Sequence, residues 1–255
     1  MPITSRQNAR VKQARALRRK KERTASGLFL VEGLRHVGEA AEHGAEITYV
    51  LHTPDLSEGD YSQNLLRQLE KSQIEMLAVS EDVFASIAEK DAKSGIIAVV
   101  EQRTRSLDDL SPENAHFLCA AARLQDPGNA GTLLRTADAA GAAGLILLGA
   151  SVDPFHPTAV RASMGTLFWL PPIIASLEEF KHWSQQHGYH VYGSSANGTV
   201  DYREAEYQSP AVLLLGSERE GLNAEEQALC ETLVRLPMAG TATSLTGSVA
   251  GGILL

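Results

Sequence analysis

Residues 117–141 read FLCAAARLQDPGNAGTLLRTADAAG, and this stretch decides the fold of the second half of the chain. It opens with an apolar run that has the length of a short buried strand. Pro127 and Gly128 then favour a tight turn, while Gly131 leaves room for another backbone or a ligand to approach. The stretch therefore predicts a strand, a turn and a helix that begins near Ala130.

Two polar side chains in this stretch, Asn129 and Arg135, are six positions apart. A helix that begins near Ala130 places the guanidinium about two turns from the amide at its N-terminus, which suits a small polar site. A strand, a turn and a helix with an Asn cap are also ordinary α/β construction. The stretch alone therefore leaves a functional and a purely structural interpretation open.

Two later segments have the same character. Residues 212–222, VLLLGSEREGL, are an apolar run followed by an acidic turn bounded by glycines. Residues 234–247, VRLPMAGTATSLTG, are a third run followed by a loop rich in Gly, Ser and Thr. Three such loops can converge at one end of a parallel sheet.

In this order, the motifs N-x-G-x3-R, L-L-G-S-E-R-x-G-L and R-L-P-M-x-G-x3-S-L resemble those of the SpoU (TrmH-type) RNA 2'-O-ribose methyltransferases of the SPOUT superfamily. Residues 29–40 and 94–100 are similar to the beginning and end of the family's N-terminal substrate-binding domain. The resemblance implies an α/β fold: a SPOUT-type parallel sheet with a C-terminal trefoil knot, preceded by a smaller N-terminal α/β three-layer substrate-binding domain. It also implies a homodimer.

The order of apolar runs gives the same division. Strands and helices alternate over residues 26–105, whereas residues 106–114 lack apolar periodicity and are expected to be a linker. Residues 115–255 form the expected catalytic domain. Runs such as LILL and VLLL indicate strands covered on both faces and hence a parallel sheet. No G-x-G-x-x-G follows any of these strands, which disfavours a nicotinamide-binding Rossmann domain.

The expected elements follow from these runs. Strands are expected at residues 28–31, 47–51, 75–79, 96–100, 117–121, 145–148, 191–194, 212–215 and 232–236. Helices are expected at residues 34–43, 61–72, 81–89, 130–140, 156–164, 177–187, 223–230 and 244–255.

Charge is distributed unevenly. Residues 1–25 carry nine Lys or Arg against one acid, whereas the rest of the chain has a net charge of −16. Thr4 or Ser5 can cap a helix there, so the segment predicts a basic helical arm. This arm either binds RNA phosphates or is a solvated helix that keeps the protein soluble. The basic residues expected to contact RNA are Arg6, Arg10, Lys12, Arg18, Arg19, Lys20, Arg35 and Arg135.

The resemblance implies S-adenosylmethionine as the cofactor, bound by the loops that follow the second and third motifs. Glycines in these loops permit close approach of main-chain N–H and C=O groups to the adenine. Each glycine by itself indicates only a turn. The residues assigned to this role are Leu215, Gly216, Ser217, Gly221, Leu236, Pro237, Met238, Gly240, Ser244 and Leu245.

The resemblance also places Arg135 nearest the ribose 2'-hydroxyl. Because a guanidinium is effectively always protonated, we expect Arg135 to bind the phosphate and the hydroxyl and to stabilise the developing alkoxide, with the proton passing late to phosphate or water. Glu218 is expected to hold Arg135 through a bidentate pair. The expected catalytic residues are Asn129, Arg135, Glu218, Ser244 and Thr246.

The third motif departs from the family pattern, which reads S-L-N where this chain has Ser244, Leu245 and Thr246. Threonine keeps one hydroxyl but lacks the simultaneous donor and acceptor of a carboxamide. The three glycines within residues 247–252 also weaken the final helix, each by about 1 kcal/mol relative to alanine. Arg161, in a further family-like stretch, is expected to line the ribose or cofactor pocket or to contact a second subunit.

Other features narrow the function class. Cys119 and Cys230 lie in no C-x-x-C motif or Cys/His cluster, so no metal is expected. No apolar stretch approaches the roughly 20 residues of a membrane span, and a cytoplasmic protein is the default. The sequence predicts an RNA 2'-O-ribose methyltransferase acting on ribosomal RNA. A tRNA methyltransferase, a catalytically weak RNA-binding SPOUT protein and a nucleotide-binding enzyme of another class remain open.

Overall fold

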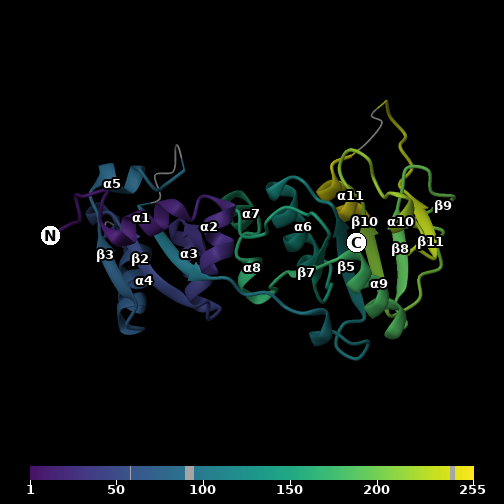
Figure 1. Ribbon diagram of the computed structural model, residues 1–255, viewed down its shortest axis with the longest axis horizontal. Coiled ribbons are helices and arrows are strands. Elements are labelled where there is room, and N and C mark those ends of the chain that lie inside the picture. The colour runs from purple at the N-terminus through teal and green to yellow at the C-terminus, as the bar shows by residue number, and fades with distance from the viewer. Residues whose placement is uncertain (58, 90–94, 242–244) are drawn as a thin grey trace. The chain divides into compact units, whose positions relative to one another are not determined.

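The structure is a computed structural model that describes residues 1–57, 59–89, 95–241 and 245–255. The chain divides into two compact units (Figure 1). Unit 1 comprises Met1–Gln102 together with Phe155–Arg161, and unit 2 comprises Arg103–Pro154 together with Ala162–Leu255. Among the described helices, none is long and apolar enough to cross a membrane.

Unit 1 is built on a four-stranded mixed sheet in the order β1-β4-β2-β3. Strand β4 runs antiparallel to both of its neighbours, whereas β2 and β3 are parallel. All four strands agree with the expected runs to within one residue. They are β1 (Leu28–Glu32), β2 (Ile47–His52), β3 (Glu75–Ala78) and β4 (Ile96–Glu101). The connecting helices are α3 (Leu34–Glu42), η1 (Pro54–Ser57), α4 (Asp60–Lys71) and α5 (Glu81–Ala85), the last shorter than expected.

The basic N-terminal segment is part of the core of unit 1. It forms two helices, α1 (Ala9–Ala16) and α2 (Lys20–Ser26), and the cap of α1 is Asn8 rather than Thr4 or Ser5. Val11, Ala14 and Leu17 are buried in the cluster that includes side chains of the sheet. The alternative of a solvated helix was therefore wrong, because these three apolar side chains pack in the core of the unit, whereas RNA binding by the segment stays a prediction.

Unit 2 is built on a seven-stranded sheet in the order β7-β6-β5-β10-β8-β11-β9. All paired neighbours are parallel, as the apolar runs predict. The strands are β5 (Phe117–Ala122), β6 (Leu145–Leu148), β7 (Ile173–Ala175), β8 (His190–Ser194), β9 (Val200–Asp201), β10 (Ala211–Leu215) and β11 (Thr232–Arg235). The edge strands β7 and β9 were not expected because they are too short to show a pattern.

Several helices of unit 2 differ from expectation. Helix α6 begins at Pro127, so Asp126 is its cap and Asn129 lies inside the first turn. The backbone N–H of Asn129 donates to the Asp126 carboxylate at 2.9 Å. The helices of unit 2 are α6 (Pro127–Ala139), α8 (Thr166–Trp169), α9 (Leu177–Gln186), α10 (Ala224–Gln227) and α11 (Gly247–Leu254), whereas α7 (Pro157–Ala162) belongs to unit 1 except for its last residue. The short α8 was missed, α10 is shorter than expected, and the expected start of α11 at residue 244 lies outside the described residues.

Residues 106–114, expected as a linker, are packed against unit 2. They contain the short helix η2 (Leu107–Asp109), and both Leu107 and Leu110 are buried in the core cluster of the large sheet. Two leucines three positions apart are too few to show a period, which is why the sequence suggested a linker.

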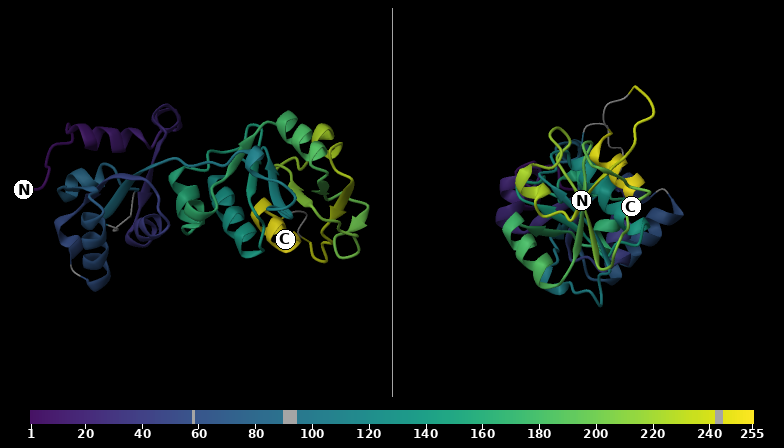
Figure 2. Two further views of the ribbon diagram at one scale, coloured as in Figure 1. Left: turned by 90° about the horizontal axis from the view of Figure 1, so that it is seen from below. Right: turned by 90° about the vertical axis from the view of Figure 1, so that its right-hand side faces the viewer.

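The C-terminal helix α11 packs against α6 and β10, as Figures 1 and 2 show. A Cβ atom on Gly251 would lie 2.7 Å from Leu133 and 2.8 Å from Leu215. A larger residue at this position would therefore force the ends of these two buried leucine side chains to move. Glycine at this position lets the helix pack closely on the sheet, although glycine lowers the intrinsic stability of the helix.

Candidate active site

The strand order of unit 2 brings together two loops that are far apart in sequence. The chain leaves β5 towards β6 and β7 on one side, while β10 lies between β5 and β8 on the other. In a parallel sheet, ligands bind at the carboxyl ends of strands where the order reverses in this way. The loops that follow β5 and β10 therefore meet at this edge of the sheet.

A cavity of about 310 Å³ lies at this edge. Its walls come from the loops after β8, β10 and β11 and from the start of α11. The lining residues are Ser194, Ser195, Ala196, Asn197, Leu215, Gly216, Ser217, Glu218, Arg219, Glu220, Gly221, Leu222, Gln227, Leu236, Met238, Leu245, Gly247 and Ala250. The volume falls within the range of about 300–1,000 Å³ typical of small-molecule pockets.

The loop after β10 is a tight turn. Ser217 and Gly221 exchange backbone hydrogen bonds of 3.1 and 2.9 Å, and Gly221 has a φ of 65°, which favours glycine. A Cβ atom on Gly216 would overlap the backbone of Gly221 and Leu222. Gly216 is therefore required by the close approach of the chain to itself within this turn, and the binding of a cofactor by its main chain stays a prediction.

Glu218 connects this turn to the start of α6. One of its oxygens accepts from the Asn129 side chain at 3.1 Å, and its two oxygens accept from the backbone N–H groups of Gln125 and Asp126 at 3.1 and 3.3 Å. Burial alone would raise the pKa of Glu218, but these hydrogen bonds together lower it. The Asn129 amide oxygen in turn accepts from Ser248 of α11 at 2.9 Å. Asn129 thus links the start of α6 to the turn after β10 and to α11 through its two amide atoms.

The expected pair between Glu218 and Arg135 is absent from the described structure. Both Glu218 oxygens are occupied by the N–H groups of residues 125, 126 and 129. Arg135 is exposed on α6, has no ion pair with a described residue and does not line the cavity. The expectation was wrong because α6 begins at residue 127, which aims Asn129 at Glu218 and Arg135 elsewhere.

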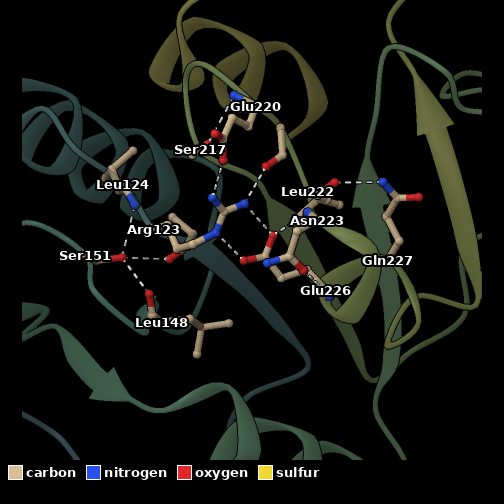
Figure 3. Close-up of polar contacts among 12 residues, drawn as sticks. Arg123, Leu124, Leu148, Ser151, Ser217, Glu220, Leu222, Asn223, Glu226 and Gln227 are labelled. Carbon is tan, nitrogen blue, oxygen red and sulfur yellow. Dashed lines mark hydrogen bonds and ion pairs between the residues drawn. The ribbon is translucent and has the colours of Figure 1, made fainter.

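A second set of polar contacts, not expected from the sequence, joins the end of β5 to the acidic turn (Figure 3). Arg123 donates to both oxygens of Glu226 at 2.7 and 3.0 Å, to Glu220 at 3.0 Å and to the Gly221 carbonyl at 2.9 Å. Glu226 is buried, and it also accepts from the Asn223 N–H at 2.8 Å. Arg123 has a positive φ of 53°, which turns its side chain from β5 towards the loop after β10.

The other expected site residues divide into three groups. Leu215, Gly216, Ser217, Gly221, Leu236, Met238 and Leu245 line the cavity, whereas Pro237 and Gly240 are not among its described lining residues. Thr246 is exposed and precedes α11, and Ser244 lies outside the described residues. The sequence missed the loop Ser194–Asn197; its signal was its position directly after a parallel strand.

The expected RNA-binding residues are mostly engaged with acids. Ion pairs join Arg6 to Asp82 at 2.5 Å, Arg10 to Glu75 at 2.6 Å, Arg18 to Glu32 at 4.0 Å, Arg19 to Glu22 at 3.4 Å and Arg35 to Glu39 at 3.8 Å. Lys12 and Lys20 are exposed and have no ion pair with a described residue. Arg161 does not line the cavity of unit 2 but pairs with Glu89 in unit 1.

The described residues contain no group of three His, Cys, Asp or Glu side chains that could hold a metal ion. Cys119 and Cys230 are free thiols, and burial raises the pKa of each to about 12. These thiols therefore remain protonated and do not act as nucleophiles.

Comparison with known proteins bears on both units. Residues 116–255 match the SpoU rRNA methylase family, and residues 8–98 match an MRM3-like substrate-binding domain. The chain is 34% identical over 261 aligned positions to the 23S rRNA (uridine(2479)-2'-O)-methyltransferase of Streptomyces viridochromogenes, covering 99% of this chain and 90% of the relative. It is 29% identical to the 23S rRNA (guanosine(2553)-2'-O)-methyltransferase RlmP of Bacillus subtilis, covering 99% and 97%.

Solved structures agree with these matches. The AdoMet-bound rRNA methyltransferase of Sinorhizobium meliloti has a TM-score of 0.89 and 37% identity, over 100% of this chain and 95% of that one. The SpoU methyltransferase AviRb of Streptomyces viridochromogenes, in complex with AdoMet, has a TM-score of 0.89 and 32% identity, over 97% and 96%. With both halves matched and the three motif loops gathered at one edge of the sheet, the chain belongs to the SpoU rRNA methylase family.

Proposed function

We propose that this chain transfers a methyl group from S-adenosylmethionine to a ribose 2'-hydroxyl of ribosomal RNA. The observation that carries the proposal is the cavity at the carboxyl ends of β8, β10 and β11, in a chain that matches AdoMet-bound relatives from end to end. The relatives' names specify a uridine in one case and a guanosine in the other, so the family does not fix the target base.

The lining of the cavity fits S-adenosylmethionine. Leu215, Leu236 and Met238 supply apolar surface for a flat ring, while the turn at Gly216–Gly221 presents main-chain donors and acceptors. Polar groups from Ser195 and Asn197 lie across the cavity and suit a ribose or an amino-acid end. When bound, the cofactor supplies a methyl group on a positively charged sulfur, which is a strong electrophile.

The protein's part in the reaction is to orient the 2'-hydroxyl and to accommodate its proton. Alignment of two reactants can lower a barrier by about 7–11 kcal/mol. The chain of contacts from Glu218 through Asn129 to Ser248 fixes the loops that form the cavity. Arg135 keeps a free guanidinium that binds the RNA phosphate and the hydroxyl, and the proton passes late to phosphate or water.

Arg135 acts, in this proposal, on the cavity of a second copy of the chain. It is exposed and absent from the lining of its own cavity. Helix α11, which packs on the helix that carries Arg135, exposes Val249 and Ile253, one turn apart on the same face. Such an apolar face suits a homodimer contact. Sedimentation of V249K/I253K at the same concentration as the wild type should show monomers.

Mixing two inactive variants tests the shared site. Arg135→Ala removes the guanidinium, and Glu218→Ala disrupts the loop of the cavity. If Arg135 acts on the partner's cavity, each mixed dimer has one intact site, and randomly mixed subunits recover about a quarter of the wild-type activity. Activity at the level of the separate variants would place Arg135 in its own subunit's site or outside the mechanism.

RNA capture is assigned to unit 1. Residues 106–255 carry 7 basic and 16 acidic side chains, so they repel a polyanion. Lys12, Lys20 and Lys21 are exposed on the basic helices of unit 1.

We further assign the protein to the cytoplasm, with its substrate. We also propose that the C-terminal segment is threaded as a trefoil knot, which the return of α11 to β10 supports.

Three measurements test the proposed function. Calorimetry should detect binding of S-adenosylmethionine, with NAD failing to compete. Mapping of ribose methylation in ribosomal RNA from cells with and without the protein should reveal one lost 2'-O-methyl group. Arg135→Ala should abolish methyl transfer without changing the circular dichroism spectrum. Binding of NAD, or an unchanged methylation map together with transfer to tRNA, would overturn the assignment.

A further inference from the structure

Unit 1 contains a second cavity, of about 290 Å³, that the proposed chemistry does not use. It lies between the basic helices, the end of β1, the start of α3 and α7. Leu30, Pro157 and Val160 give it apolar walls, and Arg18, Glu32 and His36 contribute polar side chains. The volume is suited to a single nucleobase and is too small for folded RNA.

Three side-chain atoms of residues that line this cavity are buried without a hydrogen-bond partner in the described structure. They are Nη2 of Arg18, Oε1 of Glu32 and Nε2 of His36. Only six buried side-chain atoms of the described residues lack a partner, so half of them gather at this one place. A buried polar atom without a partner destabilises the fold, and such a cluster calls for a ligand.

The other polar atoms of the same side chains are held in place. Arg18 donates through Nε to the Ile87 carbonyl at 2.6 Å, and Oε2 of Glu32 accepts from the Glu89 N–H at 3.2 Å. His36 contacts the Glu32 carbonyl through Nδ1 at 3.2 Å. Arg18 and Glu32 also face each other at 4.0 Å, too far for a hydrogen bond. The three free atoms are therefore oriented before any ligand binds.

We propose that this cavity binds one unpaired guanine base of the RNA substrate. The pairing edge of guanine offers two N–H donors beside one carbonyl acceptor. The donors suit the Glu32 carboxylate, and the acceptor suits the Arg18 guanidinium. Because Nδ1 of His36 must donate to the Glu32 carbonyl, Nε2 of the neutral ring is an acceptor, which suits an N–H group of the base. Uracil, cytosine and adenine each have a single donor group on this edge. None of them can therefore donate to the carboxylate from two neighbouring groups.

The environment of Glu32 supports this choice. Burial raises the pKa of Glu32 above its ordinary value, although the Glu89 N–H and the Arg18 charge oppose the shift. Two donors from a guanine would stabilise the charged carboxylate where water is excluded. At the rim, Arg161 pairs with Glu89, and its exposed guanidinium can reach the phosphate of the same nucleotide.

This inference rests on the proposed function, because it takes the ligand to be RNA. It adds a recognition role for unit 1: one guanosine is anchored there, separately from the nucleotide that is methylated in unit 2. A base held apart from the reacting ribose adds binding energy that depends on sequence, which phosphate contacts cannot supply.

The test uses the full chain and guanosine 5'-monophosphate as the probe, measured by calorimetry beside the adenosine, cytidine and uridine nucleotides. Guanosine monophosphate should bind at least about tenfold more tightly than the others, and Glu32→Gln should remove this preference. Glu101→Gln, an exposed acid of the same unit, is the matched control and should leave binding unchanged. Equal binding of all four nucleotides would overturn the proposal.

A second measurement does not depend on a variant that folds. The rRNA target fragment is compared with versions in which each unpaired guanosine is replaced in turn by inosine, which lacks the amino group opposite Glu32. One replacement outside the methylated position should weaken binding about tenfold, and no effect at any position would refute the guanine site. S-adenosylmethionine binding and methyl transfer are measured in the same samples. Selective guanosine binding without methyl transfer would count against the proposed function alone.

Discussion

Replacing Arg123 by alanine should destabilise unit 2 more than any exposed charge change. The guanidinium makes four hydrogen bonds, two of them to Glu226. The Glu226 side chain is 3% exposed, and without Arg123 its only remaining donor among the described residues is the Asn223 N–H. Arg123→Ala therefore leaves a buried carboxylate almost unpaired.

The structure gives the size of the effect. Removing one partner of a buried ion pair costs about 3–5 kcal/mol. Because 26% of the Arg123 side chain is exposed, water can partly replace it, and we expect a loss of about 3 kcal/mol. The backbone keeps its positive φ in the variant, so the two proteins differ in the side chain alone. Glu220→Ala breaks the same network at a carboxylate that is 75% exposed, and should cost about 0–1 kcal/mol.

Urea unfolding followed by tryptophan fluorescence measures this difference directly. Both tryptophans, Trp169 and Trp183, belong to unit 2, so the signal reports on the unit that contains Arg123. The free energy of unfolding is extrapolated to zero denaturant for the wild type and both variants. Affinity for S-adenosylmethionine should also fall about tenfold in Arg123→Ala, because Gly221 loses a charge-assisted hydrogen bond. A loss below about 1 kcal/mol, or an equal loss in Glu220→Ala, would refute the reasoning.

Four further changes test other parts of the site. Gly216→Ala should abolish S-adenosylmethionine binding in calorimetry, because its Cβ would overlap the backbone of residues 221–222. Glu218→Gln should lower the midpoint of urea unfolding at neutral pH. Because the pKa of Glu218 is depressed in the folded state, the difference between variant and wild type should shrink as the pH falls below the unfolded pKa of about 4.3. A difference in midpoint that does not depend on pH would contradict this. Gly251→Leu should cost at least about 1–3 kcal/mol by overpacking, seen as a lower thermal midpoint. Thr246→Asn should preserve or raise the initial rate of methyl transfer, and a slower variant would show that threonine is adapted to this site.

Much of the fold could be predicted because its strands are continuous apolar runs. Runs such as those at β6 and β10 need no tertiary information to be recognised as buried, and their composition already indicates parallel pairing. The edge strands β7 and β9 were missed, since three and two residues show no pattern. The basic helices were misjudged for a related reason: Val11, Ala14 and Leu17 form a narrow stripe whose burial depends on the sheet beneath it.

The candidate site was predictable as a set of loops but not as a set of contacts. The glycines of the loop after β10 identified a close approach of the main chain, and Gly216 has one. The partner of Glu218 was wrong because Glu218 lies at the first turn of α6, beside Asn129, whereas Arg135 lies almost two turns further along the same helix. Arg123 gave no signal, since its role requires β10 to lie beside β5 and its own φ to be positive.

The contacts of Glu218 and Glu220 bear on the charge of the acidic turn that contains them. Both acids of the run S-E-R-E-G have partners, because Glu218 accepts N–H groups at the start of α6 and Glu220 pairs with Arg123 at 3.0 Å. Their charges therefore shape the loop, and their field towards solvent is reduced by the groups that face them. We propose that attraction of RNA is left to unit 1, where the exposed lysines would act on phosphates in general and the polar cavity on one base. A chain with a net charge of −8 can bind RNA in this way because attraction and chemistry are carried by different units.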